Sequence, residues 1–317
     1  MFGRKDFIMS SLLELREKLR NFYSRNEAYL LPFVKFLLAL LTLNVLNMNL
    51  GYMTKINSPI LVLVVALMCS FLPMNTLVIV SAVFVVGHCY AVSMECAIVI
   101  VGVFLLMFLL YYRFSPKDTL IVVLLPLCFG MKIPFLVPIV VGLLCGPASV
   151  ISVSCGVVVY YVIKYISANA SVITSLDVDG SVAKFRYVID GLINDKAMVI
   201  VIFSFCVTTI IVYIIRRLSI DHAWTIAMFV GAVTNVIVLL VGNLMYETGF
   251  SVLSLVLGTI VALAVAKVFQ FFVFNVDYTR TEYVQFEDDE YYYYVKAVPK
   301  NTMTKSRHTV KKITSVL

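Results

Sequence analysis

The sequence predicts an all-α polytopic membrane protein, and three observations support this prediction. Of its 317 residues, 62% are apolar and only 14% are charged, which is more apolar surface than a water-soluble domain needs. Several uninterrupted apolar runs approach or exceed the roughly 20 residues with which a helix crosses a hydrocarbon layer of about 30 Å. The runs do not alternate polar and apolar residues, so they do not fit the strands of a membrane β-barrel.

Residues 1–31 predict a cytoplasmic amphipathic segment that precedes the first span. Large apolar side chains recur at helical spacing (Leu12, Leu15, Leu19 and Phe22), and charged side chains occupy the other face. Such a helix lies in the membrane interface with its apolar face toward the lipid. A docking helix for a partner protein would show the same pattern.

The first span is expected at about residues 32–50. Asn44 and Asn47 lie three positions apart on it and therefore share one face of the helix. Amides at such depth hydrogen-bond to a neighbouring helix, or they line a polar path. The sequence is compatible with both, so Asn44 and Asn47 are candidate substrate-binding residues.

The pattern of the next stretch indicates a tandem repeat, with copies at residues 58–114 and 115–166. Each copy opens with Ser-Pro, continues as two short apolar segments separated by a break, and adds a long apolar segment with a Tyr-Tyr pair. Because each unit crosses the membrane an odd number of times, the second copy is expected upside down. Inverted repeats with interrupted apolar segments are typical of secondary transporters.

The short segments allow two topologies, since a helix of 14 residues rises only about 21 Å. If they cross a locally thinned bilayer, the chain has about ten membrane segments. If each pair forms a re-entrant hairpin, the chain has about six spans plus two hairpins. In a transport core, symmetry would bring the breaks at 73–75 and 130–132 together near the midplane, with Asn75 and Lys132 as substrate-binding side chains.

The predicted transmembrane domain covers residues 32–274. It includes an outer loop at 167–196, in which a stripe of apolar residues indicates a short amphipathic helix on the outer surface, and three long spans after that loop. Lysine and arginine concentrate in the N-terminal segment, two short loops and the C-terminal tail. The positive-inside rule therefore predicts a multi-pass protein of the cell membrane with both termini cytoplasmic.

The cytoplasmic tail, residues 275–317, is expected to contain a small β-hairpin. TEYVQF and YYYYVKAV are rich in β-formers and flank an acidic EDDE turn. The basic residues that follow (Lys305, Arg307, Lys311 and Lys312) are suited to anionic lipid. Nucleic acid is not an expected partner, because the basic run is short and no reader fold precedes it.

No enzymatic motif stands out, and the sequence predicts no cofactor and no metal site. A P-loop is absent, and so are the common zinc and serine-hydrolase signatures. His88 and Glu95 lie in the first copy of the repeat. His88 is either a buried, satisfied histidine or a proton-relay group, and Glu95 is either an outer-turn residue or an intramembrane carboxylate. Both are candidate substrate-binding residues.

The tail QFEDDEYYYYVKAVPK and the stretch GMKIPFLVPIVVGLLCGP resemble a group of uncharacterised multi-pass proteins of Gram-positive bacteria that are commonly labelled ABC-transporter permeases. The resemblance spans most of the chain. It implies transport, with a separate ATPase subunit as a cytoplasmic partner. The chain departs from importer permeases because its inner loops at 113–118 and 216–222 are too short for their coupling loop.

These observations predict an integral membrane transport protein, permease-like and not an enzyme, with the lipid bilayer as its surroundings. The alternative is a membrane scaffold that anchors a cytoplasmic complex through the C-terminal tail. An enzyme acting on lipid-linked substrates ranks third, because no acid pair or metal-ligand set is evident at the interface.

Overall fold

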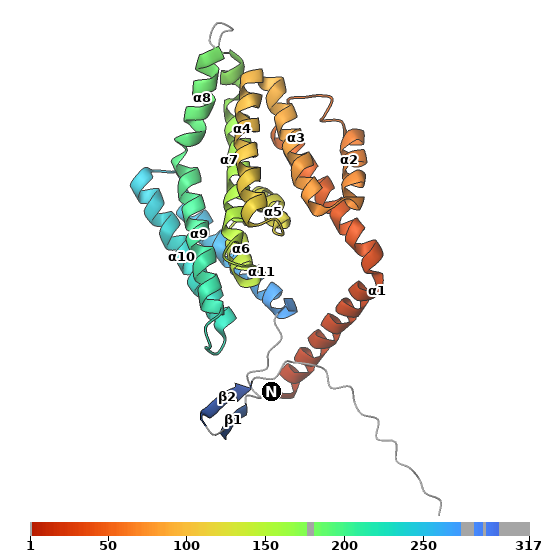
Figure 1. The fold of residues 1–317 in the computed structure, drawn as a ribbon, viewed down its shortest axis with the longest axis vertical. Helices are drawn as coiled ribbons and strands as arrows, with labels where there is room; N and C mark the ends of the chain where they lie inside the picture. Colours follow the sequence, from red (N-terminus) through yellow and green to blue (C-terminus); the bar gives the residue numbers. More distant parts are fainter. Residues whose placement is uncertain (1, 176–180, 274–281, 288–289, 298–317) are drawn as a thin grey trace, which may run out of the picture. The chain divides into compact units, whose positions relative to one another are not determined.

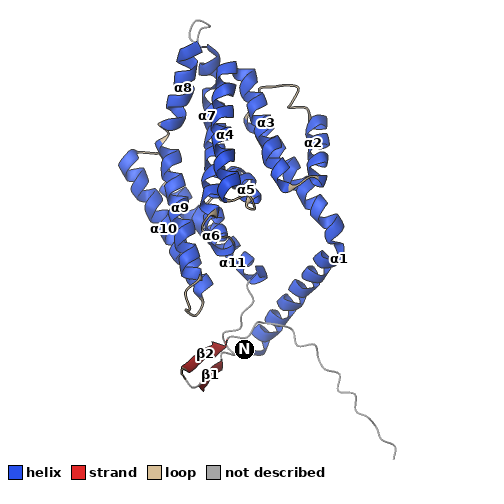
Figure 2. Cartoon of the chain, in the orientation of Figure 1, coloured by secondary structure: helices blue, strands red, loops and turns tan. Residues whose placement is uncertain are grey.

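The computed structural model describes residues 2–175, 181–273, 282–287 and 290–297. These ranges are helical apart from connecting turns and one β-hairpin (Figure 2). The chain consists of two compact units, residues 28–269 and residues 1–27 together with 270–317. The helices are α1 (Phe2–Asn49), α2 (Pro59–Phe71), α3 (Met74–Val92), α4 (Met94–Phe114), α5 (Thr119–Gly130), α6 (Leu136–Leu144), α7 (Ser149–Ser175), α8 (Ser181–Ile193), α9 (Lys196–Arg216), α10 (Ala223–Tyr246) and α11 (Val252–Val273).

Seven helical segments of the described chain are long and apolar enough to cross a membrane. They are Glu14–Asn49, α3, α4, α7, the run Val182–Arg216 through α8 and α9, α10, and α11. All ten predicted apolar segments form helices, but α2, α5 and α6 have only 13, 12 and 9 residues. The predicted class, an α-helical protein with several membrane-capable helices, is confirmed at this coarser level.

The first short pair, α2 and α3, extends along the whole second half of α1. At one end Lys35 Nζ donates to Leu72 O at 3.2 Å, and at the other His88 bonds to Asn47. The 19 residues of α3 rise about 28 Å. The break between α2 and α3 therefore lies beside Lys35, at the opposite end of α3 from His88. The pair is too long to be a short hairpin.

The second pair, α5 and α6, is a short helical hairpin. Its two open ends lie at the same end of the bundle, where Thr119 bonds to Asn75 and where Arg216 Nη2 donates to Cys145 O at 2.7 Å. At its tip, Phe129 stacks on Tyr160 with ring centroids 3.9 Å apart. Tyr160 lies near the middle of α7, so the hairpin reaches only about halfway along that helix.

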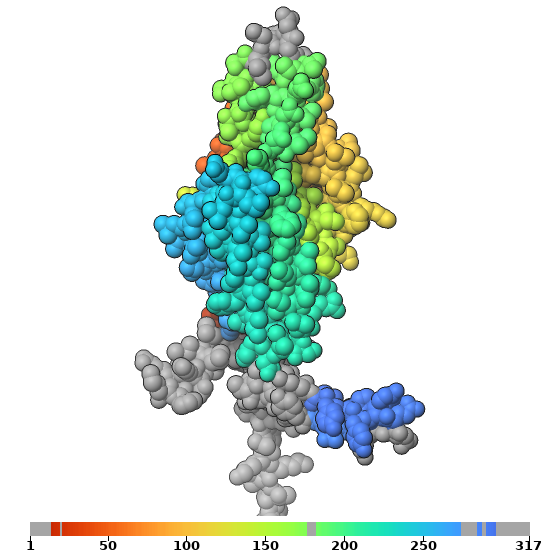
Figure 3. All heavy atoms as spheres, turned by 90° about the vertical axis from the view of Figure 1, so that its left-hand side faces the viewer, coloured from red at the N-terminus to blue at the C-terminus, as the bar shows by residue number. Residues whose placement is uncertain are grey.

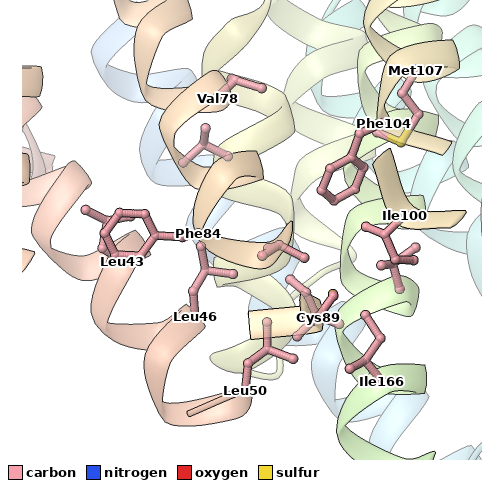
Figure 4. Close-up of a cluster of buried hydrophobic side chains, with 14 of the residues drawn as sticks. Leu43, Leu46, Leu50, Val78, Phe84, Cys89, Ile100, Phe104, Met107 and Ile166 are labelled. Carbon is pink, nitrogen blue, oxygen red and sulfur yellow. The ribbon is translucent and has the colours of Figure 1, made fainter. Parts of the chain in front are cut away.

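The helix α7 is the central element of the larger unit. Figure 1 shows it between α4 on one side and α9 on the other. One face, with Ile163 and Ile166, belongs to a core shared with α1, α3 and α4, part of which is drawn in Figure 4. Another face, with Val157 and Tyr161, belongs to a core shared with α5 and α9. α7 therefore contributes to both cores.

The predicted outer loop at 167–196 begins later than expected, and the amphipathic helix predicted within it forms as α8. α7 continues to Ser175, and α8 packs against both α4 and α7, where Tyr187 Oη donates to Asn169 Oδ1 at 3.0 Å. Val188 of the predicted apolar stripe is fully buried, whereas Val182 is 81% exposed. The predicted amphipathic helix thus forms, but its buried face covers α4 and α7. Figure 3 shows α8 and α9 following one another in one column.

In the smaller unit, the predicted β-hairpin is confirmed. β1 (Glu282–Glu287) pairs antiparallel with β2 (Tyr292–Ala297), and Phe286 stacks on Tyr293 with ring centroids 4.9 Å apart. The basic residues expected to contact lipid, 305–312, lie outside the described residues.

The N-terminal amphipathic segment is helical from Phe2, and the backbone leaves helical geometry at Asn26, five residues before the expected boundary at residue 31. Within this segment Leu15, Leu19 and Phe22 are exposed. The apolar face of an interface helix is expected to be exposed in this way.

Candidate functional site

A cavity of about 370 Å³ lies among α1, α3, α4, α5 and α7. Figure 4 shows four of the side chains that line it, Leu46 from α1, Val78 from α3, and Phe104 and Met107 from α4. Small-molecule sites usually measure about 300–1,000 Å³ and combine apolar walls with a few polar groups. This cavity matches that description, and it is the candidate functional site, called the central pocket below.

Helical spacing explains how the sequence builds the walls of the central pocket. On α4 the lining residues are Phe104, Met107, Phe108 and Tyr111, at the spacings of three and four that share a helix face. On α3 the facing positions include Ser81 and Ala82. These small side chains leave space opposite the large residues of α4, so the helices pack around a cavity.

Tyr111 closes one end of the central pocket. It is 1% exposed, and its hydroxyl lies 2.5 Å from Thr119 Oγ1 and 3.4 Å from Asn75 Oδ1. Thr119 also bonds to Asn75. Three elements, the start of α3, the end of α4 and the start of α5, are therefore joined at the closed end.

Asp118 ties the start of α7 to the same end. Its carboxylate accepts hydrogen bonds from Ser149 Oγ at 2.5 Å and from Ser115 Oγ at 2.7 Å. Ser115 also contacts Ser152 Oγ at 2.8 Å. Charge-assisted hydrogen bonds of this kind are stronger than neutral ones, so the closed end is firmly held.

The opposite end of the central pocket is open and polar. The exposed lining residues there are Asn49, Lys164, Ser167 and Ala168. Tyr52 Oη donates to Ser167 O at 3.4 Å, which places this rim at the end of α1. The central pocket thus has an apolar closed end and a polar open rim.

Lys164 is the charged residue of the rim. Its Nζ lies 5.4 Å from the centroid of the Tyr161 ring, a cation–π contact that stabilises the charge without neutralising it. None of the residues that line the central pocket is Asp or Glu. Lys164 takes part in neither of the ion pairs Lys18–Glu14 and Arg186–Asp190.

Among the predicted site residues, His88 and Asn47 lie together but outside the central pocket. Met53 N–H donates to His88 Nδ1 at 3.1 Å, and Asn47 Nδ2 donates to Ile56 O at 3.1 Å. Because a backbone N–H can only donate, the imidazole proton lies on Nε2, which donates to Asn47 Oδ1 at 2.9 Å. His88 is therefore a buried, satisfied histidine that fixes the loop after α1.

Asn44 and Glu95 lie apart from that cluster. Asn44 is exposed whereas Asn47 is 7% exposed, so the two asparagines do not form one polar path. Glu95 is in the first turn of α4, where its Oε2 accepts from Ser93 Oγ at 2.5 Å. An acidic side chain is favourable at a helix N-terminus, which agrees with the outer-turn interpretation of Glu95.

The expected meeting of Asn75 and Lys132 is wrong. Asn75 bonds to Thr119 at the start of α5, whereas Lys132 is exposed in the turn after the end of α5. The 12 residues of α5 separate them by about 18 Å. The reason is that the first pair extends along the whole second half of α1 while the second pair ends about halfway along α7, so their breaks lie at different heights.

Neither Lys164 nor Asn49 was among the substrate-binding residues predicted from the sequence. The signal for Lys164 was available, because a lone lysine within a long apolar segment marks a functional candidate. That Lys164 lines a pocket could not be predicted from the sequence, because this depends on how α7 packs against α1. In the described residues no group of three or more His, Cys, Asp or Glu side chains could hold a metal ion.

Comparisons of the chain with protein-family models, with curated proteins and with solved structures found no match.

Proposed function

We propose that the chain is a permease-like membrane transport protein whose substrate site is the central pocket. The observation that supports this most is the pocket's asymmetry, with Tyr111 at a closed end and Lys164 and Asn49 at an open rim. A site inside a helix bundle that is open toward one end is what alternating access requires of one of its states.

The helix directions support an inverted repeat as part of this proposal. The hydrogen bonds at the helix ends make α2, α3 and α4 run down, up and down when α1 runs up. Three other hydrogen bonds, at the ends of α5, α6 and α7, make α5 and α7 run up, with α6 returning between them. In this proposal the ten apolar helices serve as eight spans and one re-entrant hairpin, α5–α6. The transport proposal does not depend on the two breaks meeting.

In the proposed orientation the protein lies in the cell membrane and both of its termini face the cytoplasm. The rim with Lys164 then faces outward, since Tyr111 lies at the end with the lysine- and arginine-containing 113–118 loop. The resemblance to proteins labelled ABC-transporter permeases supports a separate cytoplasmic ATPase as partner.

Two neighbouring residues of α4 provide the test of transport. Met107 lines the central pocket, whereas Leu106 is 63% exposed on the outside of the bundle. Met107→Trp fills the pocket, and Leu106→Trp adds the same side chain outside it. Mass spectrometry of cells and medium measures the profile of small molecules and lipids in each strain. We expect the same profile for cells with the wild-type protein and cells with Leu106→Trp. Met107→Trp should match cells lacking the protein. Identical profiles for all four strains would contradict a transport role.

A membrane scaffold is the second candidate, because the hairpin exposes aromatic side chains. Tyr292 and Tyr294 are 68% and 78% exposed, and Phe286 is 51% exposed. An isolated two-stranded hairpin is marginal in water, so a bound partner would stabilise it. Deleting residues 279–300 should leave membrane insertion intact and remove a partner from affinity purifications. Unchanged partners together with unchanged activity would contradict the scaffold role.

A further inference from the structure

We propose that the central pocket binds a single-chain amphiphile with an anionic headgroup, the chain lying in the apolar interior and the headgroup at Lys164. This inference rests on the proposed function, since it names the substrate class of the same site.

The interior of the central pocket selects an apolar chain. Its buried lining consists mainly of aliphatic and aromatic side chains, including Leu46, Val78, Phe104 and Val123. Away from the two ends, the polar groups of the walls include Ser81, whose hydroxyl already donates to Leu77 O at 2.8 Å, and Tyr160, whose ring stacks on Phe129. A polar molecule would lose its hydration here without new hydrogen bonds, whereas an acyl chain loses nothing.

The rim selects a negative headgroup. Lys164 is a cation at the mouth of a cavity that has no carboxylate among its lining residues. Asn49 and Ser167 supply further polar groups beside it. A carboxylate or phosphate would accept charge-assisted hydrogen bonds from the ammonium group, while a cationic headgroup would be repelled. The rim therefore discriminates by charge as well as by shape.

The dimensions favour one chain. From Lys164 to Cys155, the lining residue nearest the closed end of α7, nine residues of helix rise about 14 Å. This depth is close to half of the roughly 30 Å hydrocarbon core, which is the length of one leaflet's chains. A volume of about 370 Å³ lies at the small end of ligand sites, so it suits one chain and not two.

Binding to the full-length protein in nanodiscs of zwitterionic lipid tests this proposal. The probes are radiolabelled myristate, tetradecanol with the same chain and a neutral headgroup, acetate as a headgroup without a chain, and dimyristoyl phosphatidate with two chains. We expect saturable binding of myristate, at least tenfold tighter than of tetradecanol, and no measurable binding of acetate or phosphatidate. A tenfold difference corresponds to about 1.4 kcal/mol.

Variants assign the two parts of the site. Lys164→Met should weaken myristate binding about tenfold or more and leave tetradecanol binding unchanged, while Lys164→Arg should retain myristate. Met107→Trp should abolish binding of both. The matched control is Lys132→Met, which removes an exposed lysine that does not line the pocket.

Several results would overturn the proposal. They are equal binding of myristate and tetradecanol by the wild type, phosphatidate binding as tight as myristate, and a Lys132→Met effect equal to that of Lys164→Met. The wild-type comparison of probes holds even if a variant fails to fold. Myristate binding without any difference between the Met107→Trp and Leu106→Trp strains would retain the ligand class and reject transport. The converse result would retain transport and reject the ligand class.

Discussion

Replacing Asn47 with leucine tests the buried hydrogen-bond cluster that fixes the loop after α1. Asn47 is 7% exposed and His88 is fully buried. The Asn47 side chain accepts from His88 Nε2 and donates to Ile56 O, at 2.9 and 3.1 Å. The substitution leaves one buried donor and one carbonyl without partners.

The expected cost follows from these two lost partners. An unsatisfied buried polar group costs about 1–3 kcal/mol in water-soluble proteins, and interhelical hydrogen bonds in membranes average about 0.6 kcal/mol. We therefore expect Asn47→Leu to lower the free energy of unfolding by about 1–3 kcal/mol. Asn44→Leu, one turn earlier at an exposed position, should change it by less than about 0.5 kcal/mol.

Reversible unfolding in bicelles by steric trapping measures both variants. A double-mutant cycle with His88→Leu should give a coupling energy of about 1 kcal/mol. Each single variant leaves one partner of the His88–Asn47 hydrogen bond unpaired, whereas the double variant removes both partners. Equal effects of Asn47→Leu and Asn44→Leu, or a coupling energy of zero, would refute the cluster as an anchor.

Three further predictions concern other parts of the chain. Arg216→Gln should destabilise the protein by about 1–3 kcal/mol because the guanidinium bonds to the carbonyls of Leu143 and Cys145 at the end of α6. Arg217→Gln, which loses only exposed contacts to Tyr213 one turn earlier, should be nearly neutral in the same unfolding assay. Gly231→Ala should cost about 1–3 kcal/mol because the new Cβ would lie 2.2 Å from a valine methyl of α9. Gly102→Ala meets no atom within 4 Å and should be neutral or stabilising by about 0.5–1 kcal/mol. In a cysteine-free background, cysteine at Ser171 should react with an impermeant reagent in intact cells and cysteine in the C-terminal tail should not; the reverse pattern would contradict the proposed orientation.

Apolar run length and local turn signals predicted the helices and the hairpin well. The ten apolar segments and the strands around the EDDE turn depend on neighbouring residues, and all of them form. The predicted ends of the helices were wrong where contacts with another helix determine how far a helix extends. α7 continues to Ser175 because α8 covers its extension, where Tyr187 Oη bonds to Asn169.

The candidate site was harder to predict than the helices. Polarity alone selected His88, Asn47 and Glu95, whose polar atoms the structure pairs with neighbouring groups. Lys164 differs from them because its neighbours in the central pocket carry no opposite charge. That difference depends on contacts between helices more than a hundred residues apart, which spacing along the chain does not encode.

A cryo-electron microscopy map of the full chain, purified with native membrane lipid in nanodiscs, tests the central claim most directly. We expect one elongated density between α4 and α5, with its broader end within hydrogen-bond distance of Lys164 and its narrow end toward Tyr111. A map in which α1 packs directly against α4 and α5, with the cavity closed and Lys164 turned away from it, would contradict the account.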